Sequence, residues 1–302
     1  MPSTAFVAGL PVPADCHGTL RTTPPQALRA PGELAHRMSQ DGYVLLRGAL
    51  DPYLVRNARR DVLERLAAVG EIAQPIDDAV ATGTSRRAEL HPDLDAFWRG
   101  VCESPRLRAL THGPALAGIT QELLGGPTEP FDFLWLRTMV QGRASPLHLD
   151  HVYMNRGTEH LVTAWIPLGD VPLIAGPLVV VEGSHRFEDV AARFRGVDVD
   201  RDGLPGSFPE DAVAFATSRG ARLLTADFTA GDVLLFDPFT LHGSCDNRMG
   251  GGRVRLSCDV RWQRAGEARD DRWFGTPPMA HGGRSYGGLN GALPLGQPYV
   301  AR

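Results

Sequence analysis

Two histidines and one aspartate stand at positions from which they could bind a single metal ion. His148 and Asp150 are separated by one residue, and His242 follows later in the chain as part of an HGS sequence at 242–244. Residues two apart on an extended strand point to the same side, so His148 and Asp150 are expected to share a face. Two imidazoles and one carboxylate form the ligand set of non-heme Fe(II) oxygenases, which leaves coordination positions open for other molecules.

The H-x-D triplet is a weak signal by itself, because most such triplets are accidents of the surface or the core. The metal prediction therefore depends on the third ligand, His242. His151 lies beside the triplet, but on the expected strand it faces the other way. The remaining candidates are predicted to be turn or hydrogen-bonding residues rather than ligands: His160, His185 and His281.

A buried arginine near the metal would be the natural partner for a free carboxylate on a chelating cosubstrate. Arg253 and Arg255 both fall on the last predicted strand, on the same face as Ser257 and Asp259. Their alternation does not distinguish the two arginines, so either could bind the carboxylate while the other is a solvated charge. Ser244 is expected on the same face as His242.

The elements that must position these residues begin at about residue 131. From there, short apolar segments alternate with Gly and Pro turns, which is typical of a sandwich or barrel. The candidate strands are 131–141, 146–154, 161–168, 178–182, 223–228, 233–237, 240–245 and 253–262.

The chain before these strands is predicted to be largely helical. A short apolar strand at 43–46 precedes a helix over 51–69, where Asp and Pro mark the start and apolar residues recur at helical spacing. A loop over 70–92 leads to a second helical stretch at about 93–124. Breaks are expected near its Ser-Pro and Gly-Pro steps, at 104–105 and 113–114.

We expect a single domain over residues 1–302, with three less regular segments. Residues 1–32 are rich in Pro and Gly and are predicted to be an extended arm or disordered. Residues 187–222 interrupt the strand pattern and are long and polar, so they are a candidate lid, or else a surface insertion. The Gly-rich tail, residues 275–302, is expected to pack as irregular coil through Tyr286, Leu289 and Leu293.

The bulk properties argue against several other classes of protein. The formal net charge is −4 and no basic stripe suggests nucleic-acid binding. No apolar run is long enough to cross a membrane, and no secretion signal is recognisable at the N-terminus. The four cysteines are scattered without a CxxC pair, which favours a reducing, cytoplasmic location over a zinc knuckle or a disulfide framework.

The ordered set of motifs resembles the phytanoyl-CoA dioxygenase family of Fe(II)/2-oxoglutarate oxygenases. The similar segments are DGYVLLRG at 41–48, HLD at 148–150, AW at 164–165, GPL at 176–178, GSH at 183–185, and HGS at 242–244 followed by Arg253. The resemblance spans roughly residues 41–262. One departure is Glu182, where the family usually has Pro before Gly-Ser-His.

The resemblance implies a mainly β fold with flanking helices, namely a double-stranded β-helix, or jelly roll, of the cupin type. It implies that His148, Asp150 and His242 bind Fe(II), and that O₂ and 2-oxoglutarate are consumed while succinate and CO₂ form. By the same resemblance, Arg253 is favoured over Arg255 as the partner of the distal carboxylate of 2-oxoglutarate. The other residues implied or considered as cosubstrate contacts are Ser244 and Trp165, and further upstream Arg137, Thr138 and Gln141.

The substrate is expected to be a polar small molecule, such as a sugar- or amino-acid-derived natural-product intermediate that is hydroxylated or cyclised. Three alternatives stay open: a metal-binding module without turnover, an enzyme of this fold that uses another metal, and an acyl-CoA hydroxylase. The oligomeric state is not predicted. Near the expected pocket the basic residues Arg86 and Arg87 are outnumbered by acids, which favours a neutral or cationic substrate. These acids are Asp77, Asp78, Glu188, Asp189, Asp198, Asp200, Asp202, Glu210 and Asp211.

Overall fold

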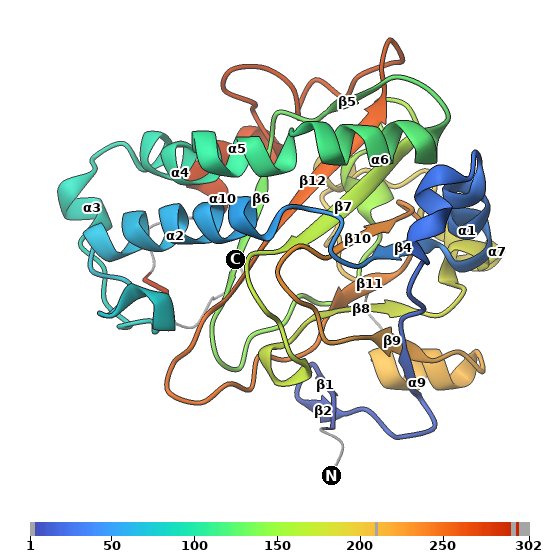
Figure 1. Ribbon diagram of the computed structural model, residues 1–302, viewed down its shortest axis with the longest axis horizontal. Coiled ribbons are helices and arrows are strands. Elements are labelled where there is room, and N and C mark those ends of the chain that lie inside the picture. The colour runs from blue at the N-terminus through green and yellow to red at the C-terminus, as the bar shows by residue number, and fades with distance from the viewer. Residues whose placement is uncertain (1–3, 209–210, 291–293, 296–302) are drawn as a thin grey trace.

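The computed structural model describes residues 4–208, 211–290 and 294–295 and shows a mixed α/β molecule built on two sheets (Figure 1). More of the described residues lie in helices than in strands, so the fold is mixed rather than mainly β. The larger sheet contains, in order, β4 (Tyr43–Leu46), β10 (Val233–Phe236), β7 (Leu161–Pro167), β12 (Arg255–Arg264) and β5 (Thr128–Pro130), and β6 (Trp135–Met139) also pairs with β12. The smaller sheet contains β11 (His242–Ser244), β8 (Leu178–Val181), β9 (Leu223–Thr225) and β3 (His17–Thr19).

The long strand β12 organises the larger sheet. It pairs antiparallel with β7 on one side, where Asp259 is opposite Trp165, and with β6 on the other, where Asp259 is opposite Trp135. The even-numbered residues from Leu256 to Trp262 join the main hydrophobic cluster, as the alternation in the sequence predicts. The odd-numbered residues form a buried polar row on the opposite face: Arg255, Ser257, Asp259, Arg261 and Gln263.

A layer of helices covers the apolar face of the larger sheet (Figure 1). Asp51 caps the first of them by accepting a hydrogen bond from the Tyr53 N–H, a contribution of about 1 kcal/mol. The predicted helix over 51–69 is confirmed, and the stretch 93–124 forms three helices that break at the predicted Ser-Pro and Gly-Pro steps. This layer contains α2 (Pro52–Ala68), α4 (Leu94–Cys102), α5 (Pro105–Thr111) and α6 (Pro114–Leu124).

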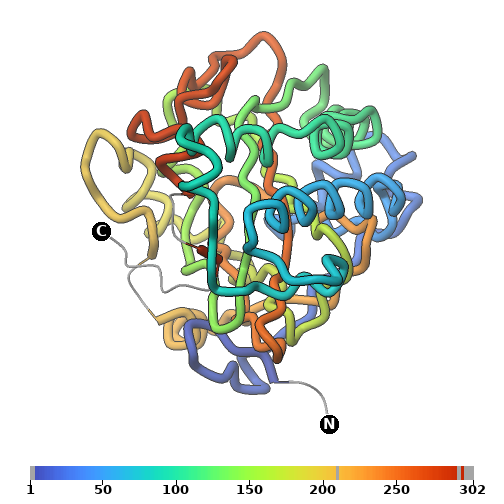
Figure 2. The backbone as a smooth tube through the Cα atoms, turned by 90° about the vertical axis from the view of Figure 1, so that its left-hand side faces the viewer, coloured from blue at the N-terminus to red at the C-terminus, as the bar shows by residue number. Residues whose placement is uncertain are grey.

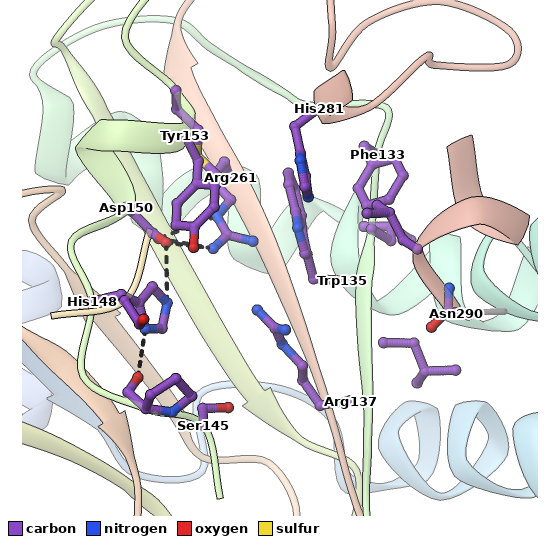
Figure 3. A pocket seen from close by; sticks show the side chains of 16 residues that line it. Phe133, Trp135, Arg137, Ser145, His148, Asp150, Tyr153, Arg261, His281 and Asn290 are labelled. Carbon is purple, nitrogen blue, oxygen red and sulfur yellow. Dashed lines mark hydrogen bonds and ion pairs between the residues drawn. The ribbon is translucent and has the colours of Figure 1, made fainter. Parts of the chain in front are cut away.

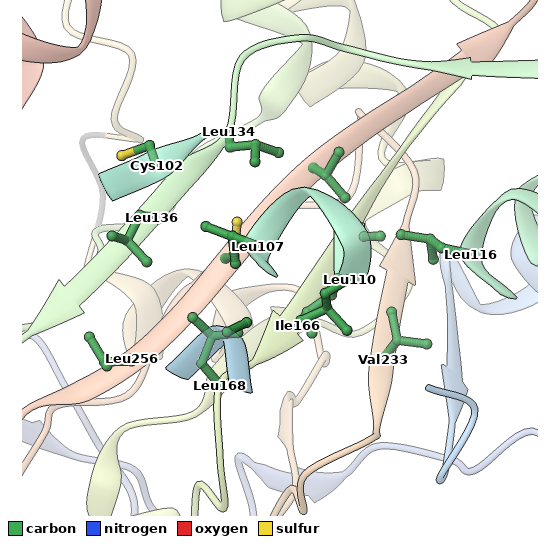
Figure 4. Close-up of a cluster of buried hydrophobic side chains, with 14 of the residues drawn as sticks. Cys102, Leu107, Leu110, Leu116, Leu134, Leu136, Ile166, Leu168, Val233 and Leu256 are labelled. Carbon is green, nitrogen blue, oxygen red and sulfur yellow. The ribbon is translucent and has the colours of Figure 1, made fainter. Parts of the chain in front are cut away.

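Most of the side chains in the main hydrophobic cluster between helices and sheet are aliphatic. Figure 4 shows Leu107 and Leu110 of α5 lying over Leu136, Ile166 and Leu256 of the strands. Fully burying one such side chain contributes about 1.5–3 kcal/mol relative to leaving it exposed. The helical layer therefore fixes the larger sheet, and with it the polar row on the other face of β12.

Two further hydrophobic clusters complete the layers. One lies between the two sheets and includes Trp165, Leu178 and Phe236. The other lies on the outer face of the smaller sheet, where Val179 and Leu223 meet buried residues of the N-terminal arm and of the segment 187–222. The site therefore lies within a stack of helices, large sheet, small sheet and an outer covering.

The predicted N-terminal arm packs on the outer face of the smaller sheet as far as it is described. β1 (Phe6–Val7) and β2 (Leu10–Pro11) pair with each other, and β3 extends the sheet by pairing parallel with β9. A 3-10 helix, η1 (Pro25–Arg29), leads to α1 (Glu33–Asp41).

The segment 187–222 is more helical than its polar composition indicates. It contains α7 (Glu188–Phe194), α8 (Val199–Asp202) and α9 (Ala212–Ser218), and it contributes Val190, Phe208 and Phe215 to the outer cluster. In Figure 2 it lies beside the C-terminal part of the chain, where Arg272 contacts Asp200 at 2.6 Å.

The described part of the tail is not plain coil, in contrast to the prediction. η6 (His281–Gly283) and α10 (Ser285–Asn290) follow each other, and Tyr286 stacks on Phe133 with ring centroids 4.2 Å apart. Leu293 lies outside the described residues. The remaining short elements are η2 (Ile76–Asp78), α3 (Arg87–Leu90), η3 (Asp150–Tyr153), η4 (Leu173–Ala175) and η5 (Ser184–Arg186).

Among the residues that the structure describes, no helix is both long and apolar enough to span a bilayer.

Candidate metal centre

Backbone pairing brings the two histidines of the predicted ligand set together. The His148 N–H donates to the His242 carbonyl at 2.9 Å, and the His242 N–H donates to the His148 carbonyl at 3.1 Å. Their imidazole rings lie 4.2 Å apart, centroid to centroid. The prediction of a strand over 146–154 is wrong, because His148 makes only isolated bridges and the chain turns into η3 at Asp150. Leu147 and Leu149 nevertheless point into the outer hydrophobic cluster, which leaves the ligands on the opposite side, as predicted.

The three donor groups converge on one point. Oδ1 of Asp150 lies 3.8 Å from Nε2 of His148 and 3.8 Å from Nε2 of His242, and all three ligand atoms lie within 4.8 Å of one another. Ligand bonds of about 2.1 Å at right angles would place donor atoms about 3 Å apart, so a small inward movement suffices to bind an ion. The three residues fit a divalent metal.

Second contacts fix the orientation of both imidazoles. Nδ1 of His148 lies 2.9 Å from the Pro146 carbonyl, and Nδ1 of His242 lies 2.9 Å from the Thr240 carbonyl. A carbonyl can only accept, so each Nδ1 carries the proton and each Nε2 presents its lone pair to the metal position.

The protonation states also suit a metal. Burial, with His242 nearby, lowers the pKa of His148 to about 3, and burial lowers the pKa of His242 as well. Burial alone would raise the pKa of Asp150, but the Arg261 guanidinium and the two histidines hold it below its usual range. At neutral pH the group therefore consists of two neutral imidazoles and one carboxylate, the forms that bind metals.

Arg261 is a functional residue that the sequence reasoning missed. It is fully buried, and its terminal Nη2 contacts Oδ1 and Oδ2 of Asp150 at 2.9 and 2.8 Å. The Thr163 hydroxyl also donates to Asp150, and the guanidinium lies over the Trp135 ring at 3.9 Å. The signal was present, because Arg261 continues the odd-numbered row of β12 that contains Arg255 and Asp259.

Behind the ligands lies a small cavity that receives several of the predicted cosubstrate contacts. Trp165, Ser244 and Arg255 line it together with His148 and His242. Arg255 is 3% exposed, and burial lowers its pKa to about 10, so it remains charged at neutral pH. Its Nη1 donates to Ser257 at 2.6 Å, whereas its Nε is buried without a hydrogen-bond partner in the described part of the chain.

The structure places Arg253 elsewhere. Arg253 is exposed, lies just before β12, and lines a separate hollow with Arg59, Asp77 and Asp78. That hollow also touches Arg255 but contains none of the three metal ligands. The geometry therefore favours Arg255 for a carboxylate bound near the metal, a choice that the strand alternation alone had left open.

In front of the ligands lies a larger pocket (Figure 3). His148, Asp150 and Tyr153 form one side, Trp135 and Phe133 form the other, and the guanidinium groups of Arg137 and Arg261 lie between them. Nε of Arg137 donates to Asp259 at 3.0 Å. Other lining residues come from distant segments: Ser207, His281, Leu289 and Asn290.

The remaining candidates are not brought to the metal position. Nε2 of His151 contacts the Arg195 carbonyl, Nδ1 of His160 contacts Glu267, and Nε2 of His185 contacts the Ser39 carbonyl. His281 lines the larger pocket, 3.5 Å from Asp200. Of the upstream cosubstrate candidates, Arg137 lines both cavities, whereas Thr138 and Gln141 line neither.

Comparison with known protein families agrees with this geometry. The family model for phytanoyl-CoA dioxygenase matches residues 38–254. The chain belongs to this family. Phytanoyl-CoA dioxygenase relatives are Fe(II)/2-oxoglutarate-dependent oxygenases, and His148, Asp150 and His242 form the His–Asp–His triad of this one.

Characterised relatives within the family act on different molecules. The 1-deoxypentalenic acid 11-beta-hydroxylase of Streptomyces exfoliatus is 30% identical over 242 residues, which cover 76% of this chain and 80% of the relative. The L-proline trans-4-hydroxylase of Streptomyces griseoviridis is 29% identical over 225 residues, which cover 70% of this chain and 79% of the relative. In fold, the chain is similar to the epimerase SnoN from a structure with Fe³⁺, alpha ketoglutarate and nogalamycin RO, with a TM-score of 0.54, 22% identity, and coverage of 82% and 87% of the two chains.

Proposed function

We propose that this protein couples the oxidative decarboxylation of 2-oxoglutarate to the oxidation of a C–H bond in a small natural-product intermediate. The observation that carries this proposal is the position of the triad between two cavities, one holding a buried arginine and one open to a substrate. Iron and 2-oxoglutarate, when bound, supply the activation of O₂. The residues of this chain bind, orient and exclude competing reactions.

Within this proposal, His148, Asp150 and His242 hold the iron. The Nδ1–carbonyl contacts orient the two imidazoles, and Arg261 with Thr163 orients Asp150. Because Arg261 contacts both carboxylate oxygens, Asp150 offers the metal one oxygen at a reduced negative charge. These partners keep the three donor atoms converged before the metal arrives.

The distal carboxylate of 2-oxoglutarate is proposed to bind Arg255 rather than Arg253. Arg255 is buried and lines the small cavity with His242, and its Nε, which has no hydrogen-bond partner among the described residues, offers a hydrogen bond that a carboxylate would accept. Ser244 and Trp165 line the same cavity and are proposed to contact the cosubstrate. Ser244 already has one role, because its Oγ accepts from the Ser145 N–H at 2.8 Å.

The outcome of the reaction is proposed to be hydroxylation or ring closure of a biosynthetic intermediate, in an antibiotic pathway or a similar one. Support comes from a relative named as a hydroxylase of 1-deoxypentalenic acid and from the likeness in fold to an epimerase from nogalamycin biosynthesis. Proteins of this fold therefore catalyse different reactions, and the pocket of this chain must determine which substrate binds and how it reacts.

Three further statements belong to this proposal. The two stacked sheets are proposed to form a double-stranded β-helix, supported by the likeness in fold to an alpha-ketoglutarate-dependent epimerase. Residues 1–302 are proposed to act as one domain, supported by the packing of the N-terminal arm on the smaller sheet. A cytoplasmic location stays a prediction from the sequence.

Succinate formation tests the proposal. The purified protein supplied with Fe(II), O₂ and 2-oxoglutarate is expected to form succinate, and His242→Ala is expected to form at least a hundredfold less. Arg60→Gln, on the exposed face of α2, serves as a control that leaves the rate unchanged. Equal succinate formation by wild type and His242→Ala would contradict the proposal.

A further inference from the structure

The larger pocket combines apolar walls with two arginines. Its apolar lining residues include Trp135, Phe133, Met154 and Leu289, and Arg137 and Arg261 contribute the cationic groups. Such a combination fits a ligand with an apolar frame and an anionic group. The arginines differ, because Arg261 is fully buried against Asp150 whereas the Arg137 side chain is 32% exposed.

Arg137 presents free donor atoms to this pocket. Its Nε donates to Asp259, and its two terminal nitrogens have no hydrogen-bond acceptor among the residues that the structure describes. Figure 3 shows the guanidinium inside the pocket, between His148 and Trp135. The terminal edge of a guanidinium offers two parallel N–H groups, which match the two oxygens of a carboxylate.

The charges of the two cavities leave one positive charge uncompensated. The guanidinium groups of Arg137, Arg255 and Arg261 are accompanied by the carboxylates of Asp150 and Asp259. Fe(II) and the 2-oxoglutarate dianion would cancel each other, so the loaded site keeps a single net positive charge. Buried charges in proteins are normally paired, and a monoanionic substrate would pair this one.

The acidic residues that favoured a neutral or cationic substrate are engaged elsewhere. Asp198 pairs with Arg156, Asp200 with Arg272, and Asp189 with Arg219. Asp77 and Asp78 line the hollow beside Arg253, not the larger pocket. Glu210 lies outside the described residues. Of the acids that favoured a neutral or cationic substrate, none that the structure describes lines the larger pocket.

We propose that the substrate of this enzyme carries a carboxylate, which binds the terminal nitrogens of Arg137 while its apolar frame lies against Trp135. The inference rests on the proposed function and adds the substrate class. Trp135 and Arg137 are two apart on β6 and face the same pocket, so one molecule can contact both. Arg137 thereby acts as a specificity-determining residue, and the carboxylate fixes which part of the frame faces the metal.

Binding of matched probes to the loaded protein tests this inference. Wild-type protein with Ni(II) and saturating 2-oxoglutarate is titrated with 1-naphthoic acid, 1-naphthamide and 1-naphthylmethylamine. A second series uses cyclohexanecarboxylic acid, cyclohexanecarboxamide and cyclohexylmethylamine. The carboxylates are expected to bind at least tenfold more tightly than their amides, equivalent to about 1.4 kcal/mol. Equal binding of acid and amide, or binding of none of the acids, would overturn the inference.

Two variants and a control sharpen the result. Arg137→Gln is expected to abolish the preference for the acids, whereas Arg21→Gln, in an exposed ion pair with Asp41, keeps it. Asp259→Asn removes the carboxylate that competes for Arg137, so it is expected to strengthen binding of the acids at least threefold. A gain in binding cannot arise from misfolding.

The same titrations separate the two possible sources of the carboxylate. If Arg137→Gln weakens binding of 2-oxoglutarate and leaves the naphthoate preference intact, Arg137 serves the cosubstrate and the inference is wrong. If wild-type protein binds neither Ni(II) nor 2-oxoglutarate, the proposed function itself fails. The titrations therefore distinguish failure of the inference from failure of the proposed function.

Discussion

The two walls of the larger pocket are built in different ways. The strand wall, named for its backbone and not for one side of the pocket, consists of Trp135, Arg137 and Arg261 on β6 and β12, and the ligands His148 and Asp150 lie next to it. The loop wall consists of Tyr153, Ser207, His281, Leu289 and Asn290, which come from 3-10 helices, a connection and a short terminal helix.

This comparison assigns the chemistry to the strand wall and the choice of substrate to the loop wall. On the strand wall, ladder hydrogen bonds and the helical layer fix the backbone, and buried ion pairs fix the side chains. On the loop wall, the segments meet through side chains such as His281 and Asp200. Loops tolerate substitution better than the elements that they connect, so substrate range can change there without disturbing the triad.

Asp150→Ala is predicted to have the largest effect, because Asp150 serves both metal binding and folding on the strand wall. Succinate formation should fall at least a hundredfold. The substitution also leaves Arg261 buried without its partner, which should lower the free energy of unfolding by about 3–5 kcal/mol. On the loop wall, Asn290→Ala should change the free energy of unfolding by no more than about 1 kcal/mol, and it should leave succinate formation within about tenfold of wild type. Assays of succinate formation and denaturant unfolding measure both variants.

Arg261→Gln should weaken metal binding about 10- to 100-fold, because partners of metal ligands typically contribute that much. Arg261→Lys should recover part of the lost metal affinity, since it restores the positive charge but not the contact with both carboxylate oxygens of Asp150. The matched control is Arg264→Gln at the end of the same strand, where the side chain donates to the Gly125 carbonyl. Wild-type affinity for Ni(II) in Arg261→Gln would show that the triad holds its shape without this arginine.

Arg255→Gln should raise the KM for 2-oxoglutarate at least tenfold, since a lost charge-assisted hydrogen bond costs about 1.5–3 kcal/mol. Arg253→Gln should raise it less than twofold, because Arg253 is exposed and lies outside the small cavity. The reverse order would restore the assignment that the family resemblance favoured. Initial rates of succinate formation over a range of 2-oxoglutarate concentrations decide between them.

The contrast between walls also marks what the sequence could predict. Alternation along β12 predicted the face of Asp259, because a strand has a fixed period of two. The same rule predicted a shared side for His148 and Asp150, and they do converge, although Asp150 begins a 3-10 helix and does not continue a strand. The same period could not choose between Arg253 and Arg255, which share a face and differ only in where the strand begins. That boundary depends on the pairing of Arg255 with Met139, a contact distant in sequence.

The loop wall lay beyond sequence reasoning for a related reason. The tail was expected to be coil because it is rich in glycine, yet Tyr286 stacks on Phe133 and α10 forms around that contact. The packing of the segment 187–222 depends on Phe208 and Phe215 meeting the smaller sheet. Long-range packing overrides local propensity at both places.

Hydrogen exchange should show the two walls as different in mobility. Amides of the segment 187–222 are expected to exchange faster than those of β12, and to slow when Ni(II), 2-oxoglutarate and 1-naphthoate are added. Slowing would support a lid, and its strongest effect is expected near Ser207, which lines the pocket. Unchanged exchange across the whole segment would identify it as a surface insertion.

The smallest predicted effect is a reduced release of protons when metal binds. Two histidines with ordinary pKa values would together release about 1.5 protons at pH 6. The pKa of His148 is lowered to about 3, so this imidazole is already neutral at pH 6, and the pKa of His242 is also lowered, so this imidazole is protonated less than an ordinary histidine. Titration with Ni(II) in two buffers of different ionisation enthalpy should therefore give fewer than about 0.8 protons, the number that one ordinary histidine would release. Release of a full proton would place the histidine pKa values near the ordinary one.

The mutual backbone hydrogen bonds of His148 and His242 have a consequence for the chain as a polymer. A metal ion bound to both imidazoles is a reversible cross-link that closes the whole loop between them, in a chain whose four cysteines are all free. Closing a long loop restricts mainly the unfolded chain, so the cross-link favours the folded form even before any substrate arrives. Starvation for iron would then lower the lifetime of the protein as well as its activity, and the cell would lose apo chains first.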